Sequence, residues 1–228
     1  MTLKQFVKEL NGNRVEGELI KTVFYSLITS FIFLAVLYSL KLQYVEDFLS
    51  KKAFHLFFAA LSYALIVPAM KHVRAYKELP CMSGMMVGMT VGAIAGFLSA
   101  FHVTATNGMF VGSVFGMAVG IAFGTLTGKC CGIMGFMEGI MAGFMGGLMG
   151  AMAAFMLLND NIKLASVITL IISAVIIFGL HYMLYKDTKE NERGLYEGNF
   201  VTFLTTLILI AVTTGIIVFG PRSAIFGG

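Results

Sequence analysis

Sulfur-bearing side chains are concentrated in one third of this chain. Residues 81–157 hold 13 of its 16 methionines and all 3 of its cysteines. Thiolate and thioether sulfurs are the ligands that select Cu(I) over harder cations. We therefore expect a soft-metal site in this segment, with Cys81, Cys130 and Cys131 capturing the ion at its entrance. The candidate ligands are Cys81, Met82, Met85, Cys130, Cys131, Met134, Met137, Glu138 and Met141.

Glu138 is the only acidic residue inside the hydrophobic segments that we predict to cross the membrane. A carboxylate in a bilayer is unfavourable unless it is paired or protonated, so such a residue is functional by default. Glu138 could help to bind a cation or carry a proton. It could also simply bond Lys129, Thr90 or Thr125, and the spacing does not decide among these.

A stripe of methionines follows the same helix face as Glu138. Its members recur, together with Glu138, at intervals of three and four residues, which is the spacing of one helix face: Met134, Met141, Met145, Met149, Met152 and Met156. Thioethers in series would give weak, exchangeable sites, as ion transport requires. The simpler interpretation is that flexible methionines fill gaps beside glycine. Adjacent cysteines at a membrane boundary are also typical of palmitoylation sites.

Glycines in the same segment are spaced for helix packing. Residues 81–157 hold 17 of the 26 glycines, and most recur every fourth residue. Such rows leave one helix face without side chains, and in lipid they mark close helix–helix contacts. Three successive helices that each carry a row predict a tightly packed core of the glycine-zipper kind. The packing glycines are Gly84, Gly88, Gly92, Gly112, Gly116, Gly120, Gly135, Gly139 and Gly143.

The segment also contains an internal repeat. Ser83-Gly-Met-Met-Val-Gly recurs as Asn107-Gly-Met-Phe-Val-Gly at the start of the next predicted span. Successive spans run in opposite directions, so the two copies are inverted, as in many transporters. Duplication of a glycine-rich hairpin for packing explains the repeat equally well.

The elements that must position these residues are transmembrane helices. The chain is 58% hydrophobic and only 12% charged, about half the charged fraction of a soluble domain. A span needs about 20 apolar residues. Seven segments approach or exceed this length: 20–40, 53–70, 81–103, 106–128, 130–157, 164–185 and 200–220. The sequence thus predicts an all-α polytopic transmembrane helical bundle of about seven spans with a three-helix core.

The chain divides into four parts by composition. Residues 1–19 form an amphipathic segment whose apolar residues fall at helical spacing: Leu3, Phe6, Val7 and Leu10. The core occupies residues 81–157. Two helices in 20–70 and two in 164–220 flank it, and we expect these four to surround the core as a lipid-facing ring.

Positive charges set the predicted orientation. Of the 16 Lys and Arg residues, eleven fall on the side of the N-terminus: Lys4, Lys8, Arg14, Lys21, Lys71, Arg74, Lys77, Lys129, Lys186, Lys189 and Arg193. Five fall on the other side: Lys41, Lys51, Lys52, Lys163 and Arg222. This asymmetry predicts a plasma-membrane protein with a cytoplasmic N-terminus and an exterior C-terminus. His102 and Asn107, predicted in an exterior turn, could form an exit mouth.

The block from Cys81 to Met156, with NGMFVG, GKCCGIMG and MEGIMAGFMGGLMGAM, resembles a Gly/Met-rich membrane segment of uncharacterised Firmicutes-type membrane proteins. In some of those proteins the segment stands next to a cupredoxin-like copper-binding domain. The resemblance covers residues 81–157 and implies a copper-associated membrane role. Against that pattern, we expect no exterior β-domain and find no Cys-His-Met cupredoxin ligand set in this sequence.

These observations leave three hypotheses. The first is a membrane protein that binds or transports a soft cation, Cu(I), through residues 81–157. The second is a structural or assembly subunit whose glycine faces dock onto copies of itself, as a homo-oligomer, or onto a larger membrane complex. The third is a cation channel or proton-coupled carrier that uses Glu138. The sequence has no motif of an ATPase, hydrolase or metalloprotease and no basic patch with interleaved aromatics, so we expect neither an enzyme nor a nucleic-acid-binding protein.

Overall fold

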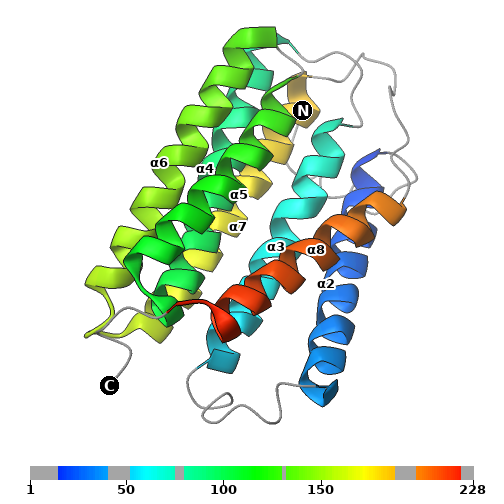
Figure 1. Ribbon diagram of the computed structural model, residues 1–228. Coiled ribbons are helices and arrows are strands. Elements are labelled where there is room, and N and C mark those ends of the chain that lie inside the picture. Colours follow the sequence, from blue (N-terminus) through cyan, green and yellow to red (C-terminus); the bar gives the residue numbers. More distant parts are fainter. Residues whose placement is uncertain (1–14, 41–51, 75–79, 130–131, 188–198, 222–228) are drawn as a thin grey trace.

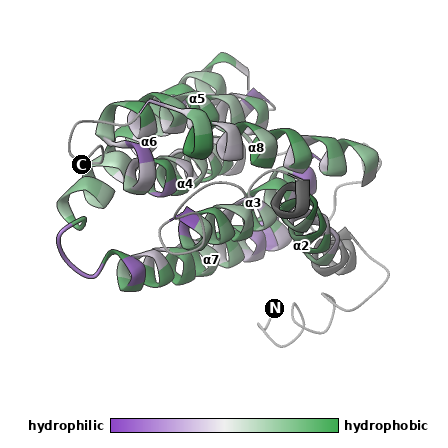
Figure 2. Ribbon diagram, turned by 60° about the horizontal axis from the view of Figure 1, so that its bottom comes forward, coloured by the Kyte–Doolittle hydropathy of each residue, from purple (hydrophilic) through white to green (hydrophobic). Residues whose placement is uncertain are grey.

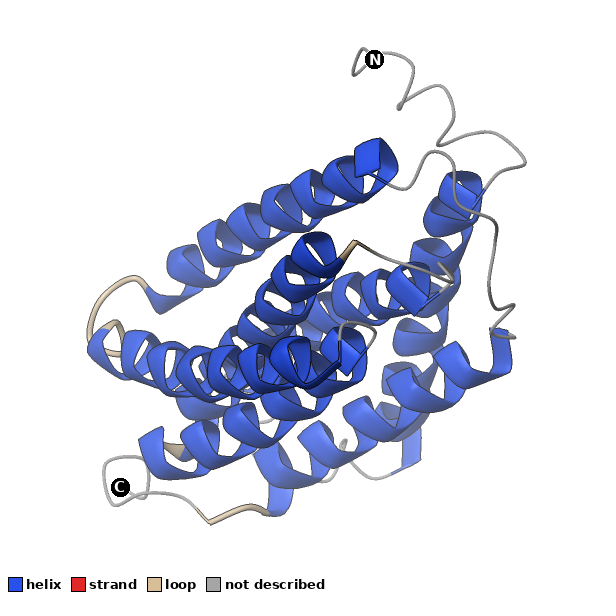
Figure 3. Cartoon of the chain, turned by 90° about the horizontal axis from the view of Figure 1, so that it is seen from above, coloured by secondary structure: helices blue, strands red, loops and turns tan. Residues whose placement is uncertain are grey.

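The regular structure of the described residues is entirely helical (Figures 1 and 3). The computed structural model describes residues 15–40, 52–74, 80–129, 132–187 and 199–221. The helices are α2 (Val15–Leu40), α3 (Ala53–Arg74), α4 (Cys81–Asn107), α5 (Met109–Gly128), α6 (Gly132–Met156), α7 (Ile162–Asp187) and α8 (Asn199–Phe219). Each corresponds to one predicted span and differs from it by only a few residues at either end. The predicted all-α transmembrane bundle is therefore confirmed.

Six of these helices are long and apolar enough to cross a bilayer, and α2 has a shorter apolar part, Thr22–Val36. Successive helices run in opposite directions, so each connection returns the chain toward the other end of the bundle (Figure 1). These properties define a multi-pass membrane protein. The apolar residues of the predicted amphipathic segment fall within 1–14, outside the described residues.

Helices α4, α5 and α6 pack backbone against backbone. A β-carbon on Gly92 would lie 2.9 Å from Gly124 Cα and 3.2 Å from Gly139 O, so all three helices meet where this residue has no side chain. A β-carbon on Gly120 would lie 2.7 Å from Gly143 O. Because these distances are too short for a real side chain, any larger residue must push the helices apart. The glycine rows thus face one another within a single chain.

Helices α4 and α6 run parallel to each other, because α5 returns the chain between them. Gly88 of α4 lies beside Gly128 of α5, and Gly128 lies beside Gly135 of α6. Further along α4 and α6, Gly96 lies beside Gly147. The first turns of α4 and α6 therefore share one end of the core with the last turn of α5 (Figure 1).

The turn between α4 and α5 consists of one residue. Gly108 has a φ of 113°, a conformation that glycine adopts without steric penalty, so α4 continues to Asn107 and α5 begins at Met109. The prediction that His102 lies in this turn is wrong, because His102 is inside α4 and fully buried. Asn107 is buried as well, and its Nδ2 donates to the Ile216 carbonyl oxygen at 2.7 Å. Neither residue forms an open mouth.

The other four helices lie on one side of the three-helix core (Figure 2). Helices α3 and α7 pack on α4, and α2 and α8 pack on α3, whereas α6 makes extensive contacts only with α4 and α5. The expected ring around the core is therefore wrong. A ring is not needed, because the outer faces of α5 and α6 are themselves apolar and suit contact with lipid.

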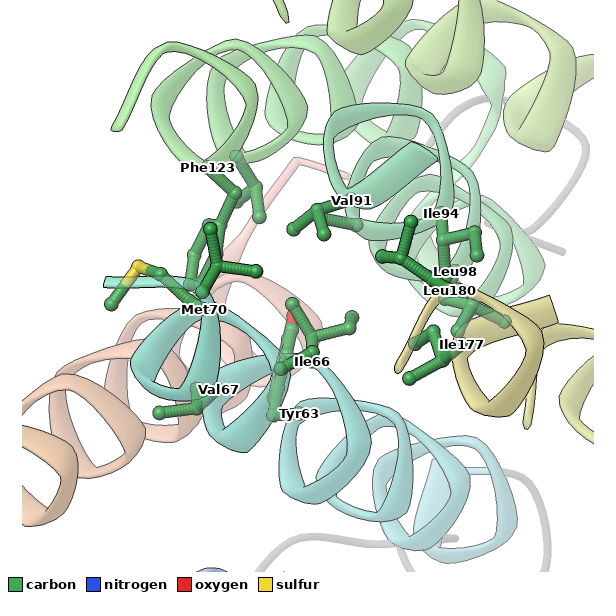
Figure 4. Packing of buried hydrophobic residues seen from close by; sticks show 14 of the residues in the cluster. Tyr63, Ile66, Val67, Met70, Val91, Ile94, Leu98, Phe123, Ile177 and Leu180 are labelled. Carbon is green, nitrogen blue, oxygen red and sulfur yellow. The ribbon is translucent and has the colours of Figure 1, made fainter. Parts of the chain in front are cut away.

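Large side chains fill the interface between this second layer and α4 (Figure 4). Ile66 of α3, Leu98 of α4 and Leu180 of α7 belong to one buried cluster and are at most 6% exposed. Helix α4 is thus the centre of the molecule, with a glycine face toward α5 and α6 and an aliphatic face toward α3 and α7.

Candidate functional site

The sulfur-bearing first turns of α4 and α6 lie at the same end of the core. Cys81 and Met82 begin α4 and are both exposed, and Met134 in the first turn of α6 is 69% exposed. The predicted ligands Cys130 and Cys131 lie outside the described residues. The parallel course of α4 and α6 therefore brings sulfur atoms of two helices to one end of the membrane-spanning core.

The methionine stripe of α6 faces away from the core. Met145 and Met156 are 58% and 71% exposed, and the other members of this face are exposed too: Met134, Met137, Met141, Met149 and Met152. The opposite face of α6 carries the glycines that contact α4 and α5. The stripe consequently does not line a path inside one chain, so a series of internal thioether sites, one of the two interpretations of this stripe, is not formed there.

Glu138 lies at the margin of this stripe and is half-buried. Its Oε2 atom is buried and has no hydrogen-bond partner. The hydroxyl groups of Thr90 and Thr125 donate instead to carbonyl oxygens one turn back in their own helices, at 2.7 and 2.8 Å. No ion pair among the described residues joins Glu138 to Lys129. A carboxyl oxygen therefore remains unsatisfied within the apolar part of the protein, where such atoms are rare.

The edge of α6 that carries Glu138 faces α4. Gly139 lies beside both Gly124 of α5 and Gly92 of α4, and Gly146 contacts Ala93 of α4. Glu138, Ala142 and Gly146 are spaced four residues apart, so they lie along one edge of the helix. Ala142 is buried on that edge. Glu138 thus lies on the border between this buried edge and the exposed methionine face of α6.

The helix register places two methionines of α4 level with Glu138. Ala93 contacts Gly146, and the next turn of each helix repeats this contact, so the parallel helices keep one register. Met86 and Met89 precede Ala93 by seven and four residues and occupy the same face of α4. The register sets both methionines beside the turn of α6 that carries Glu138. Met86 and Met89 are 49% and 46% exposed, so their side chains lie at the outer rim of the junction between α4 and α6.

The predicted ligands of α4 differ in their placement. Met82 is 80% exposed and Met85 is half-buried, while Met86 and Met89 were not in the predicted ligand set. The spacing of Met86 and Met89 to Ala93 is visible in the sequence. Only the contact of Ala93 with α6, however, shows that this face of α4 meets Glu138.

Two buried pairs of histidines join α3 to its neighbours, and neither pair was predicted. The ring centroids of His55 and His102 are 6.2 Å apart, between α3 and α4. The Nδ1 atoms of His72 and His181 are 3.1 Å apart, between α3 and α7. The partners of the second pair are 109 residues apart in the chain, so no local pattern signals them.

Comparison with protein-family models, with curated proteins and with solved structures gives no match. The resemblance to Gly/Met-rich segments therefore stays a prediction. Within the described residues, no three His, Cys, Asp or Glu side chains form a group that could hold a metal ion. Fold and composition define the class of the protein as a polytopic α-helical membrane protein.

Proposed function

We propose that this membrane protein binds a soft cation, Cu(I), at the junction of α4 and α6, as one step in moving it through or along the membrane. The observation that supports the proposal best is the unpartnered, buried Oε2 atom of Glu138, on a turn of α6 that the helix register places level with Met86 and Met89 of α4. A buried carboxylate is stabilised by a cation, and thioether sulfur selects a soft one.

Cu(I) fits this combination of ligands better than a hard cation does. Hard cations such as Ca²⁺ and Mg²⁺ need six or more oxygen ligands, and Glu138 alone supplies too few. One carboxylate also neutralises one positive charge, so a monovalent ion leaves no net charge in the apolar junction. Cys81 and Met82, exposed at the same end of α4, would receive the ion first.

The exposed methionines of α6 have a smaller part in this proposal. Met134, Met137 and Met141 flank Glu138 on the outer face, where they would exchange the ion with the junction. They would do so at the protein surface, because that face is exposed along its length. Transport by this route therefore needs either a second chain or a membrane-facing path.

Competition against a chromophoric Cu(I) chelator tests the proposal on the full chain in detergent. Glu138→Gln removes the charge and keeps the shape, and we expect it to weaken Cu(I) binding by about tenfold or more, or about 1.4 kcal/mol. A double Met86→Leu, Met89→Leu variant should weaken it comparably. Met152→Leu is the matched control, because Met152 lies on the exposed stripe far from Glu138. Wild-type affinity in both site variants would contradict the proposal.

A second function is favoured by the same carboxyl group. An intramembrane carboxyl without a fixed partner is also what a proton-coupled carrier or cation channel uses. Proton flux into liposomes that contain the protein distinguishes the two functions. Flux that is lost in Glu138→Gln but kept in the Met86→Leu, Met89→Leu variant favours a carrier, whereas Cu(I) binding lost in both favours the metal site.

The assembly function has less support from the packing. The glycine faces of α4, α5 and α6 contact one another within the chain, so a partner would have to dock on the methionine face of α6. For the orientation, we keep the proposal of a plasma-membrane protein with a cytoplasmic N-terminus and an exterior C-terminus, which depends on the charge asymmetry alone. Cysteine accessibility to a membrane-impermeant reagent at Cys81 tests it, because Cys81 is exposed.

A further inference from the structure

The hydrogen bonds around His102 fix which of its ring nitrogens carries the proton. The Ser62 hydroxyl donates to the Phe58 carbonyl oxygen at 2.8 Å, and Ser62 Oγ lies 3.4 Å from His102 Nε2. A hydroxyl has only one proton to donate. Ser62 is therefore the acceptor at the second contact, and Nε2 of His102 carries the hydrogen. The Nδ1 atom of His102 is left with a free lone pair.

A second buried imidazole with an unsatisfied nitrogen lies near the His102 ring. His102 is fully buried, and its Nδ1 has no hydrogen-bond partner. His55 of α3 is 6% exposed, and its Nδ1 is also buried without a partner. The two ring centroids are 6.2 Å apart. Two buried imidazole nitrogens without partners, from two helices in one cluster, are unfavourable unless something binds them.

The arrangement has the features of a prepared metal ligand. A histidine that binds a metal through one nitrogen almost always donates its other N–H to a fixed acceptor, which orients the ring. Ser62, itself held by the Phe58 carbonyl, supplies that acceptor for His102. A metal ion bonded to both rings at about 2 Å would hold their centroids no more than about 6.4 Å apart. The observed separation lies just within this limit, so an ion shared by the two Nδ1 atoms would have an almost linear N–metal–N arrangement.

Linear coordination by two imidazoles suits Cu(I), whereas Zn²⁺ requires about four ligands. Charge favours the same choice. Lys163 Nζ lies 5.9 Å from the ring centroid of Phe54, next to His55, and Lys52 is buried just before α3. Positive neighbours repel a divalent ion twice as strongly as a monovalent one.

We infer that His55 and His102 form a Cu(I) site between α3 and α4, at the end of α4 opposite to Cys81. His102 is 21 residues beyond Cys81 (81 to 102), which is about 30 Å along a helix. This site shares no residue with the thioether site, which is the site proposed above at Glu138, Met86 and Met89. An experiment can therefore contradict one of the two proposals without affecting the other. If both are correct, α4 carries one soft-metal site near each end.

The second histidine pair provides the matched control. His72 and His181 are as deeply buried, but their Nδ1 atoms lie within hydrogen-bonding distance of each other, at 3.1 Å. One ring donates through its Nδ1 and the other accepts at its Nδ1, so both Nδ1 atoms are satisfied without a metal. A variant of His181 therefore removes a buried imidazole from α7 without touching the inferred site.

X-ray absorption spectroscopy of the Cu(I)-loaded full chain in nanodiscs tests the inference, because imidazole and sulfur ligands give different scattering. We expect imidazole scattering in the wild type. His102→Gln and His55→Gln should each lose both this scattering and one equivalent of bound Cu(I), whereas His181→Gln should keep both. Retention in the Met86→Leu, Met89→Leu variant would separate this site from the thioether site. Imidazole scattering that is absent from the wild type, or unchanged in His102→Gln, overturns the inference and leaves a buried water as the occupant.

A milder variant covers the case in which His102→Gln fails to fold, as judged by size-exclusion chromatography. Ser62→Ala removes the acceptor of the Nε2 proton while leaving both imidazoles in place. We expect it to weaken Cu(I) binding by about tenfold, the usual effect of losing such a partner, and Ser62→Thr to restore it. Wild-type Cu(I) affinity in Ser62→Ala would overturn the inference.

Discussion

The two faces of α4 show two ways of holding helices together in a membrane. Toward α5 and α6, glycines bring backbones into direct contact, as at Gly92 and Gly120. Toward α3 and α7, large aliphatic side chains such as Leu98 interlock, and the Ser83 hydroxyl of α4 donates to Asp187 of α7. Because lipid is as apolar as leucine, both faces depend on close packing rather than on the removal of water. The comparison therefore predicts opposite responses to changes in side-chain size.

The largest effect is expected where the backbones touch. Gly120→Leu places a side chain where a β-carbon alone would already lie 2.7 Å from Gly143 O and 2.8 Å from Gly96 Cα. Backbone atoms cannot move aside as a side chain can, so we expect separation of the three helices and loss of the folded protein. Size-exclusion chromatography and thermal unfolding in detergent measure this.

The control for this variant is Gly179→Leu in α7, where no atom lies within 4 Å of the added β-carbon. It should fold normally and unfold within a few degrees of the wild type. Equal damage from both variants would mean that loss of glycine as such, and not backbone contact, is responsible.

This glycine-packed core was predictable because its signal is local. Rows at every fourth residue identify a helix face without reference to any other part of the chain, and the three helices are consecutive. The span limits followed from hydropathy in the same way. Within the three-helix core the largest difference is at the end of α4, because the positive φ of Gly108 allows the helix to run on to Asn107 with no loop.

The second layer and the site depended on contacts that no local pattern records. A methionine stripe opposite a glycine row shows only that the stripe is not packed against the same partners. Whether another helix covers the stripe depends on where α3 and α7 pack, and they pack on the side of α4 that faces away from α6. Likewise, Ser62 and His102 are 40 residues apart. The sequence located the sulfur atoms and Glu138, but not the face of α4 that Glu138 meets.

The aliphatic face of α4 should respond to truncation instead of enlargement. Leu98 is fully buried among residues of α3 and α7. Leu98→Ala leaves a cavity, and we expect a loss of about 2–5 kcal/mol in the free energy of unfolding. Steric-trap or denaturant unfolding in micelles measures the loss. Leu98→Met, which keeps the volume, serves as the control and should cost less than about 1.5 kcal/mol. A loss below about 1 kcal/mol in Leu98→Ala would mean that the layers are not tightly packed.

The polar links of the second layer should contribute less than its aliphatic packing. Tyr63 OH and Thr213 Oγ1 are 2.8 Å apart, and Thr213 Oγ1 also donates to the Leu209 carbonyl oxygen, so the tyrosine is the donor. In Tyr63→Phe, Thr213 keeps its bond to Leu209. We expect a loss of about 0.6 kcal/mol, the average for hydrogen bonds between membrane helices. The double-mutant cycle with Thr213→Val isolates this term, and a coupling above about 2 kcal/mol would show that the link, and not the aliphatic packing, holds α8 to α3.

The smallest effect is expected on the outer methionine face of α6, which belongs to neither type of interface. Met149 is 61% exposed, and lipid can adapt to a larger side chain there. Met149→Phe should therefore change the free energy of unfolding by less than about 0.5 kcal/mol. The same enlargement would be costly if a second copy of the chain covered this face, because a packed interface resists added volume. Unfolding and native mass spectrometry of the same variant thus separate the two cases. A loss above about 1 kcal/mol in the free energy of unfolding, together with loss of a dimer, would show that α6 has a third packing face. An unchanged monomer leaves lipid as the neighbour of this face.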